Sequence, residues 1–113
     1  MRKVSVILLT IILLSTSLSF AATQALKKSL ALTFSGTTAN CEMNVEKDGA
    51  SITAKMELWQ GTTKLHEWSG AGSDSVTLSG NHNCVSGISY ELRGSGKVNG
   101  VSFNITPVTR ICP

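Results

Sequence analysis

The sequence predicts an all-β fold: an antiparallel two-sheet sandwich of about six to seven short strands, preceded by a cleaved signal peptide. Three observations lead to this prediction. Apolar and polar residues alternate along almost every segment after the first 28 residues, helical periodicity is nearly absent, and turn residues recur about every eight to twelve positions. Alternation of this kind is typical of strands that have one buried face and one face in water.

The N-terminal residues have the composition of a secretory signal. Two basic residues precede an apolar run over residues 4–14, and a Ser/Thr-rich stretch then ends in small residues. We therefore expect residues 1–21 to be a signal peptide that is cleaved after Ala21, with Ala25 as the second choice. The apolar run is shorter than the roughly 20 residues that a spanning helix needs. The expected product is secreted or at the cell surface, with no stable membrane span.

Cleavage leaves a chain of one domain's length. We expect residues 22–28 to form a short leader and residues 29–113 to form the β-sandwich domain, because about 90 residues are enough for one domain and too few for two. From residue 22 onward, eight Lys and Arg residues stand against seven Asp and Glu residues, which leaves a charge of +1. A charge this close to neutral gives no support for nucleic-acid binding, so we expect no nucleic-acid partner.

The first half of the domain contains four predicted strands, at residues 30–34, 39–46, 52–59 and 64–68. A turn at residues 47–49 separates the second from the third, and a short loop joins the third to the fourth. We expect Trp59 to pair with Lys64 across this loop. That register places Lys55 opposite Trp68 on the outer face. It also turns Glu67 toward the core, which points to a slipped register or to an edge strand.

The second half contains three further predicted strands, at residues 76–78, 88–92 and 101–105. The middle one carries Tyr90, the only Tyr in the chain. In sandwich domains a Tyr at such a corner bonds through its hydroxyl to backbone upstream. Asn99 and Gly100 suit the two central positions of a hairpin turn that requires positive φ. These three residues are the predicted structural anchors of the domain.

Several short motifs follow one another along the mature chain: Thr37-Thr38-Ala39-Asn40-Cys41, Leu58-Trp59-Gln60-Gly61, the corner from Gly87 to Tyr90, Val98-Asn99-Gly100 and the final Ile111-Cys112. On these motifs the chain resembles small secreted bacterial proteins of unknown function that have a single immunoglobulin-like or fibronectin-type-III-like β-sandwich. Antibody-type domains have a Cys two residues after the corner Tyr, where this chain has Leu92. The resemblance therefore implies the wider sandwich architecture rather than an activity.

The three cysteines lie in the part of the chain that we expect to be exported, where disulfides persist. One bridge and one spare thiol follow from the odd count. We favour Cys41 with Cys112, because this bridge closes a loop of about 70 residues and so contributes on the order of 4 kcal/mol. Cys41 with Cys84 is the close rival. The spare thiol is either a buried small apolar side chain or the site of an intermolecular disulfide that links two copies.

No catalytic, cofactor-binding or metal-binding motif stands out. His66 and His82 are the only imidazoles, and neither has a nucleophile or an acid at a spacing typical of a catalytic site. The Cys and His residues do not have the spacings of a zinc site, and the Asp residues stand alone. We expect no enzyme activity, no cofactor and no bound metal.

Trp59 and Trp68, with His66 between them, form the predicted binding surface. In the expected register both Trp side chains face outward, where they can offer a platform to a sugar ring or to a partner protein. The alternative is that they cover the sheet or enter the core. The favoured function is a secreted non-catalytic module that binds an extracellular protein or glycan. The alternatives are a structural or assembly subunit at the cell surface and a secreted inhibitor or antimicrobial effector.

Overall fold

A computed structural model describes residues 25–113, and strands account for 83% of them. The prediction of an all-β fold is therefore confirmed. The predicted signal peptide and its cleavage after Ala21 lie outside the described residues. Within residues 25–113 there is no helix that is long and apolar enough to cross a membrane.

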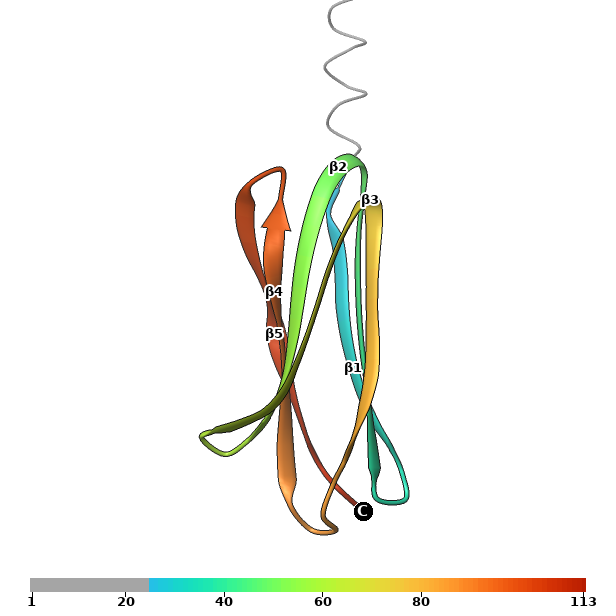
Figure 1. Cartoon of the computed structure of the whole chain (residues 1–113), viewed down its shortest axis with the longest axis vertical. Helices are drawn as coiled ribbons and strands as arrows, with labels where there is room; N and C mark the ends of the chain where they lie inside the picture. The colour runs from blue at the N-terminus through green and yellow to red at the C-terminus, as the bar shows by residue number, and fades with distance from the viewer. Residues whose placement is uncertain (1–24) are drawn as a thin grey trace, which may run out of the picture.

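Five antiparallel strands form one curled sheet, which resembles a half-barrel (Figure 1). The strands are β1 (Lys27–Ser35), β2 (Thr38–Gln60), β3 (Thr63–Asn83), β4 (Ser89–Val98) and β5 (Val101–Ile111). The sheet order is β1-β2-β4-β5, and β3 pairs with β2. The first half of β2 lies between β1 and β3, whereas its second half lies between β3 and β4. β1 begins at Lys27, inside the segment that the sequence predicts to be a leader.

The structure has five strands where the sequence predicts six to seven, and one curled sheet where it predicts two. The predicted strands at residues 39–46 and 52–59 are the two halves of β2, and those at 64–68 and 76–78 belong to β3. β2 and β3 bend together and stay paired on both sides of the bend, from Glu46 opposite Ser75 to Ser51 opposite Ser73. Because the two strands turn as one hairpin, the turn does not divide the sheet.

Three residues with positive φ shape the end of the domain where β2 bends. Gly49 has φ 74° and Asp74 has φ 70°, and the Gly49 amide donates a 2.7 Å hydrogen bond to the Asp74 carboxylate. Asn99 (φ 49°) begins the β4–β5 turn; its amide donates to the Ser51 carbonyl at 2.8 Å, and its side-chain oxygen accepts from the Ser51 amide at 2.9 Å. The predicted hairpin turn thus also ties β4 and β5 to β2.

The core lies between the two facing halves of the curled sheet. β2 supplies more than half of it, through side chains that alternate along both halves of the strand: Ala39, Cys41, Met43, Val45, Ala50, Ile52, Ala54, Met56 and Leu58. Each large aliphatic side chain among them stabilises the fold by about 1.5–3 kcal/mol through burial. Within the described part of the chain, no polar or charged residue is buried.

Tyr90 and one disulfide hold the end of the domain away from the bend. The Tyr90 side chain is buried, and its hydroxyl accepts a 2.8 Å hydrogen bond from the Val85 amide. This is the contact to upstream backbone that the sequence predicts for a Tyr at this corner. The disulfide joins Cys84, which follows β3, to Cys112, which follows β5. It fixes the C-terminal residues beside the loop that leads into β4.

The predicted bridge between Cys41 and Cys112 is wrong, because Cys112 pairs with Cys84 and Cys41 is a free, buried thiol. Backbone hydrogen bonds explain the pairing. The Gly87 amide donates to the Cys112 carbonyl at 2.8 Å, and the Cys112 amide donates to the Ile88 carbonyl at 2.9 Å. These bonds bring the segment after Cys84 alongside the C-terminus. Cys41 instead lies inside β2, opposite Leu32 of β1, and faces the core.

Candidate functional site

The predicted binding surface of Trp59, Trp68 and His66 is divided between the two faces of the sheet. Trp59 pairs with Lys64 as predicted, but a β-bulge follows, with Leu65 as the extra residue of β3. The bulge reverses the facing of the residues beyond it. His66 therefore lies opposite Leu58, and Trp68 lies opposite Met56. Since both partners are core residues, the prediction that the two Trp side chains share the outer face is wrong.

Trp59 is on the outer face, where charged neighbours cover it. The guanidinium carbon of Arg93 lies 4.1 Å from the centroid of the Trp59 ring, a close cation–π contact. The indole nitrogen of Trp59 donates a 3.3 Å hydrogen bond to Glu57, and Arg93 forms an ion pair with Glu91. One face of the indole is thus occupied by a side chain of the protein itself, so the ring is not a free platform.

Lys64 links two carboxylates on the same outer face. Its ammonium lies 3.0 Å from Glu67 and 3.6 Å from Glu57. The hydrogen bond to Glu67 raises the pKa of Lys64, and the same bond lowers the pKa of Glu67. The bulge at Leu65 explains why Glu67 points to water rather than to the core. Lys64 and Glu67 are exposed to solvent and Glu57 is partly buried, so the network lies on a solvated charged face and contributes little to stability.

The two halves of β3 approach each other along a line that we call the β3 seam. Across it, small inward-facing residues lie opposite large ones: Gly72 beside Val76, Gly70 beside Leu78, and Trp68 over Gly80. A Cβ atom at Gly80 would lie within 2.8 Å of Trp68 Cζ2 and closer still to Nε1 and Cε2. Gly80 therefore leaves the space that the Trp68 indole fills.

His66 and His82 lie at the end of the β3 seam that is farthest from the bend. Their ring centroids lie 6.4 Å apart, and the His66 ring lies 4.5 Å from the Trp68 ring. His82 Nδ1 lies 2.8 Å from the carbonyl oxygen of Asn83. Because a carbonyl can only accept a hydrogen bond, Nδ1 carries the proton and Nε2 is left with its lone pair. The bulge thus brings together the only two imidazoles of the chain.

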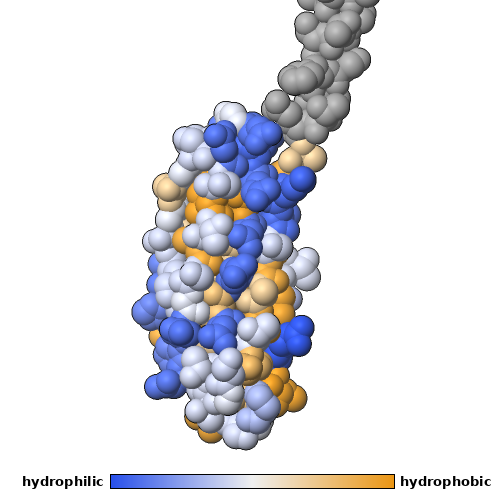
Figure 2. Space-filling view, turned by 90° about the vertical axis from the view of Figure 1, so that its right-hand side faces the viewer, coloured by the Kyte–Doolittle hydropathy of each residue, from blue (hydrophilic) through white to orange (hydrophobic). Residues whose placement is uncertain are grey.

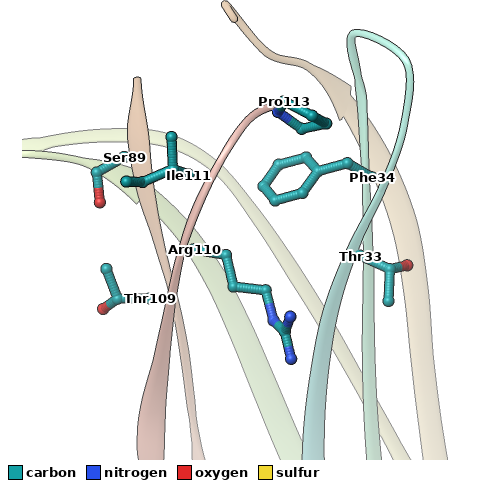
Figure 3. A pocket seen from close by; sticks show the side chains of 7 residues that line it. All are labelled: Thr33, Phe34, Ser89, Thr109, Arg110, Ile111 and Pro113. Atoms are coloured by element: carbon teal, nitrogen blue, oxygen red, sulfur yellow. The ribbon is translucent and has the colours of Figure 1, made fainter. Parts of the chain in front are cut away.

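A groove between β1 and β5 is the other candidate site, and we call it the Arg110 groove. It has a volume of about 650 Å³ and is lined by Thr33, Phe34, Ser89, Thr109, Arg110, Ile111 and Pro113. Figure 3 shows the Arg110 side chain extending from β5 toward β1, and the Phe34 ring extending from β1 toward β5. Of the ion pairs formed by residues 25–113, none involves Arg110.

Rigid elements support the walls of the Arg110 groove. The Phe34 ring packs against Tyr90 at a centroid distance of 6.5 Å, and Tyr90 is fixed through its hydrogen bond to Val85. Two exposed apolar side chains flank the disulfide at this end: Val85, 61% exposed, follows Cys84, and Ile111, 65% exposed, precedes Cys112. On the face in Figure 2, apolar patches alternate with hydrophilic residues instead of forming one broad surface. The sequence gives no signal for this groove, because Phe34 and Arg110 are far apart in the chain.

Burial makes the Cys41 thiol unreactive. The side chain is almost completely enclosed, and loss of solvation raises its pKa to about 11. Little thiolate therefore forms at neutral pH, and the thiolate is the form that attacks disulfides. The spare cysteine corresponds to the first of the two predicted roles, a buried small apolar side chain. No cluster of three or more His, Cys, Asp or Glu side chains suited to a metal ion occurs among residues 25–113.

Comparisons with known proteins identify the fold but no family. No model of a known protein family matches the chain, and no curated protein matches it. Among solved structures, OgpA from Akkermansia muciniphila is similar with a TM-score of 0.54 and 10% identity; the match covers 77% of this chain and 28% of OgpA. A Bordetella pertussis protein described as ApaA is similar with a TM-score of 0.53 and 14% identity, over 80% of this chain and 95% of that protein. At these identities the likeness is one of fold alone: a small all-β domain.

Proposed function

We propose that the protein is a secreted, non-catalytic binding module that holds an acidic segment of a partner protein in the Arg110 groove. One observation carries the proposal: a guanidinium without an ion-pair partner in the described part of the chain extends into a groove beside an aromatic ring. Arg binds carboxylates through two parallel hydrogen bonds, which makes it a selective group for an Asp or Glu side chain or for a C-terminal carboxylate.

The surroundings of Arg110 favour a protein partner over a glycan. Phe34 offers an apolar wall, and the exposed side chains of Val85 and Ile111 lie at the same end of the domain. Exposed aliphatic residues of this kind are typical contacts for apolar side chains of another protein. The glycan alternative depends on a platform of two Trp rings, and Trp59 and Trp68 lie on opposite faces. We therefore infer a ligand with a carboxylate next to an apolar side chain.

Two features support the secreted and sandwich-like parts of the proposal. A disulfide between Cys84 and Cys112 suits an oxidising compartment, as does the signal-like composition of the N-terminus. The facing halves of the sheet and the Tyr90 corner are in keeping with an immunoglobulin-like or fibronectin-type-III-like domain. Intact-mass measurement of the exported protein tests export and distinguishes cleavage after Ala21 from cleavage after Ala25.

Binding is tested by NMR titration of the mature protein with two short peptides that differ in one group. An N-acetylated Leu-Asp dipeptide amide should shift the Arg110 Nε–H and Phe34 signals, and the matched Leu-Asn peptide should not, because only the first carries a carboxylate. Arg110→Gln should abolish the shifts, while Arg93→Gln, a surface Arg outside the groove, should leave them unchanged. Equal shifts with both peptides, or shifts that persist in Arg110→Gln, would overturn the proposal.

The second candidate, an assembly subunit, is favoured by one feature, the long strand β3. In the described structure β3 pairs only with β2, so its other edge can accept a strand of another copy. The covalent route through the spare cysteine loses its support, because Cys41 is buried and its pKa is raised. Light scattering and a non-reducing gel separate the two functions. The binding module should be a monomer, whereas an assembly subunit should form oligomers that survive dilution.

A further inference from the structure

We propose that His66 and His82 together bind a divalent transition-metal ion of the Cu²⁺/Zn²⁺ class at the end of the β3 seam. The two residues lie 16 positions apart in one strand, and the bend of β3 brings their rings to a centroid distance of 6.4 Å. This site is separate from the Arg110 groove, which lies between β1 and β5, and the inference does not depend on the proposed function.

The distance between the rings suits a shared ion. Two imidazoles whose nitrogens lie about 2.0–2.1 Å from one ion have ring centroids roughly 5–6 Å apart. The observed separation of 6.4 Å is therefore about 1 Å too long. His66 is exposed, so a small rotation of its side chain closes the gap without disturbing the core. Trp68, packed over Gly80, supports the His66 ring from below.

The orientation of His82 is the second, independent observation. Its Nδ1–H donates to the Asn83 carbonyl at 2.8 Å, which fixes the tautomer and leaves the lone pair on Nε2. Metal-binding histidines commonly donate their other ring nitrogen to a backbone carbonyl or a carboxylate in this way, because that bond orients the ring and raises its basicity. The hydrogen bond to Asn83 thus uses Nδ1 and leaves Nε2 of His82 free to bind a metal ion.

The donor set indicates the class of ion. Imidazole suits Cu²⁺, Ni²⁺ and Zn²⁺ and is a poor ligand for Ca²⁺ and Mg²⁺, and Cu²⁺ has the highest affinity in the divalent series. Among residues 25–113, no third His, Cys, Asp or Glu side chain joins the pair. Water therefore completes the coordination, and the ion keeps open positions that a ligand from a second molecule can fill.

Titration of the untagged mature protein with Cu²⁺ or Zn²⁺ alone tests this site. We expect one equivalent to bind, and His66→Ala or His82→Ala should each weaken binding by about tenfold or more, since losing even a supporting contact commonly costs that much. The double variant gives the background from the terminal amine and the carboxylates. Electron paramagnetic resonance of the Cu²⁺ complex should show two imidazole nitrogens in the wild type and one in each single variant.

Trp68 offers an optical readout of the same event. Cu²⁺ at the imidazoles should quench the fluorescence of the adjacent Trp68 indole, chelation should restore it, and Trp68→Phe should remove most of the quenching. Both His side chains lie outside the core, so we expect each variant to fold. Circular dichroism of each variant checks this. Binding equal in the wild type and in the double variant, or a spectrum with a single imidazole nitrogen in the wild type, would overturn the inference.

Discussion

Gly80→Ala tests the packing of the β3 seam, because the new methyl group has no room. A Cβ atom at Gly80 would lie within 2.8 Å of Trp68 Cζ2 and even closer to two other indole atoms. Ordinary carbon contacts are about 3.5–4.0 Å, so the indole must move by roughly 1 Å or leave the seam. Overpacking of this kind costs about 1–3 kcal/mol. The lower entropy of Ala in the unfolded chain offsets about 0.5 kcal/mol of this.

The net loss of about 0.5–2.5 kcal/mol should lower the midpoint of thermal unfolding by roughly 2–20 °C for a domain of this size. Urea denaturation followed by circular dichroism measures the free energy of unfolding directly. Ser79→Ala is the matched control. Ser79 precedes Gly80 on β3 but is exposed, so its substitution should change stability by less than about 0.5 kcal/mol.

A double-mutant cycle isolates the contact with the indole. In a Trp68→Leu background the space above residue 80 is free, so Gly80→Ala should be neutral or slightly stabilising. The coupling free energy should then be about 1–3 kcal/mol, in the range of residues in direct contact. If Gly80→Ala destabilises both backgrounds equally, the cost comes from the backbone of β3 and the packing argument is refuted.

Two further predictions concern buried groups. Tyr90→Phe deletes the acceptor of the Val85 amide and should lower the free energy of unfolding by about 1 kcal/mol, with faster hydrogen exchange of that amide; unchanged exchange would contradict the assigned bond. Burial raises the pKa of Cys41 from 9.0 to about 11, so the unfolded chain loses this proton first as pH rises. Stability should therefore be complete below about pH 9 and fall by about 2 kcal/mol toward pH 11. Urea titrations at both pH values should show this loss of stability in the wild type but not in Cys41→Ala. An equal loss in both proteins would contradict the assignment of the loss to Cys41.

The sequence predicts which segments are strands, because alternation with period two depends only on neighbouring residues. Every predicted strand segment lies within the five observed strands except for Ile88, which directly precedes β4. The turn at Asn99 and Gly100 is also local, since both residues tolerate positive φ and have it in the structure. The continuity of β2 and β3 through the bend is not local. It depends on Asp74, whose carboxylate meets the Gly49 amide from a strand 25 residues away.

The sequence could not predict which face of the sheet each site residue lies on, because this depends on β-bulges. One extra residue at Leu65 reverses the direction of His66 and Trp68. A second irregularity lies in β5 between Ile105, which pairs with Gly94 of β4, and Val108, which pairs with Leu92. It sets the direction of Arg110 at the end of β5. A register shift of one residue exchanges the two faces of a strand. Composition therefore identified a histidine and two Trp residues of interest but not the surface on which each of them lies.

Both candidate sites lie at the end of the domain away from the bend. At the bend, the bonds of Gly49 to Asp74 and of Asn99 to Ser51 satisfy polar groups within the fold. At the other end, Arg110 extends from the β5 edge, and the two imidazoles lie on the β3 edge. Buried residues of β2 and β4 fill the space between these edges, so neither site needs the other to form. Arg110→Gln should then leave the metal site intact, and the His variants should leave the groove intact, which makes each set the control for the other.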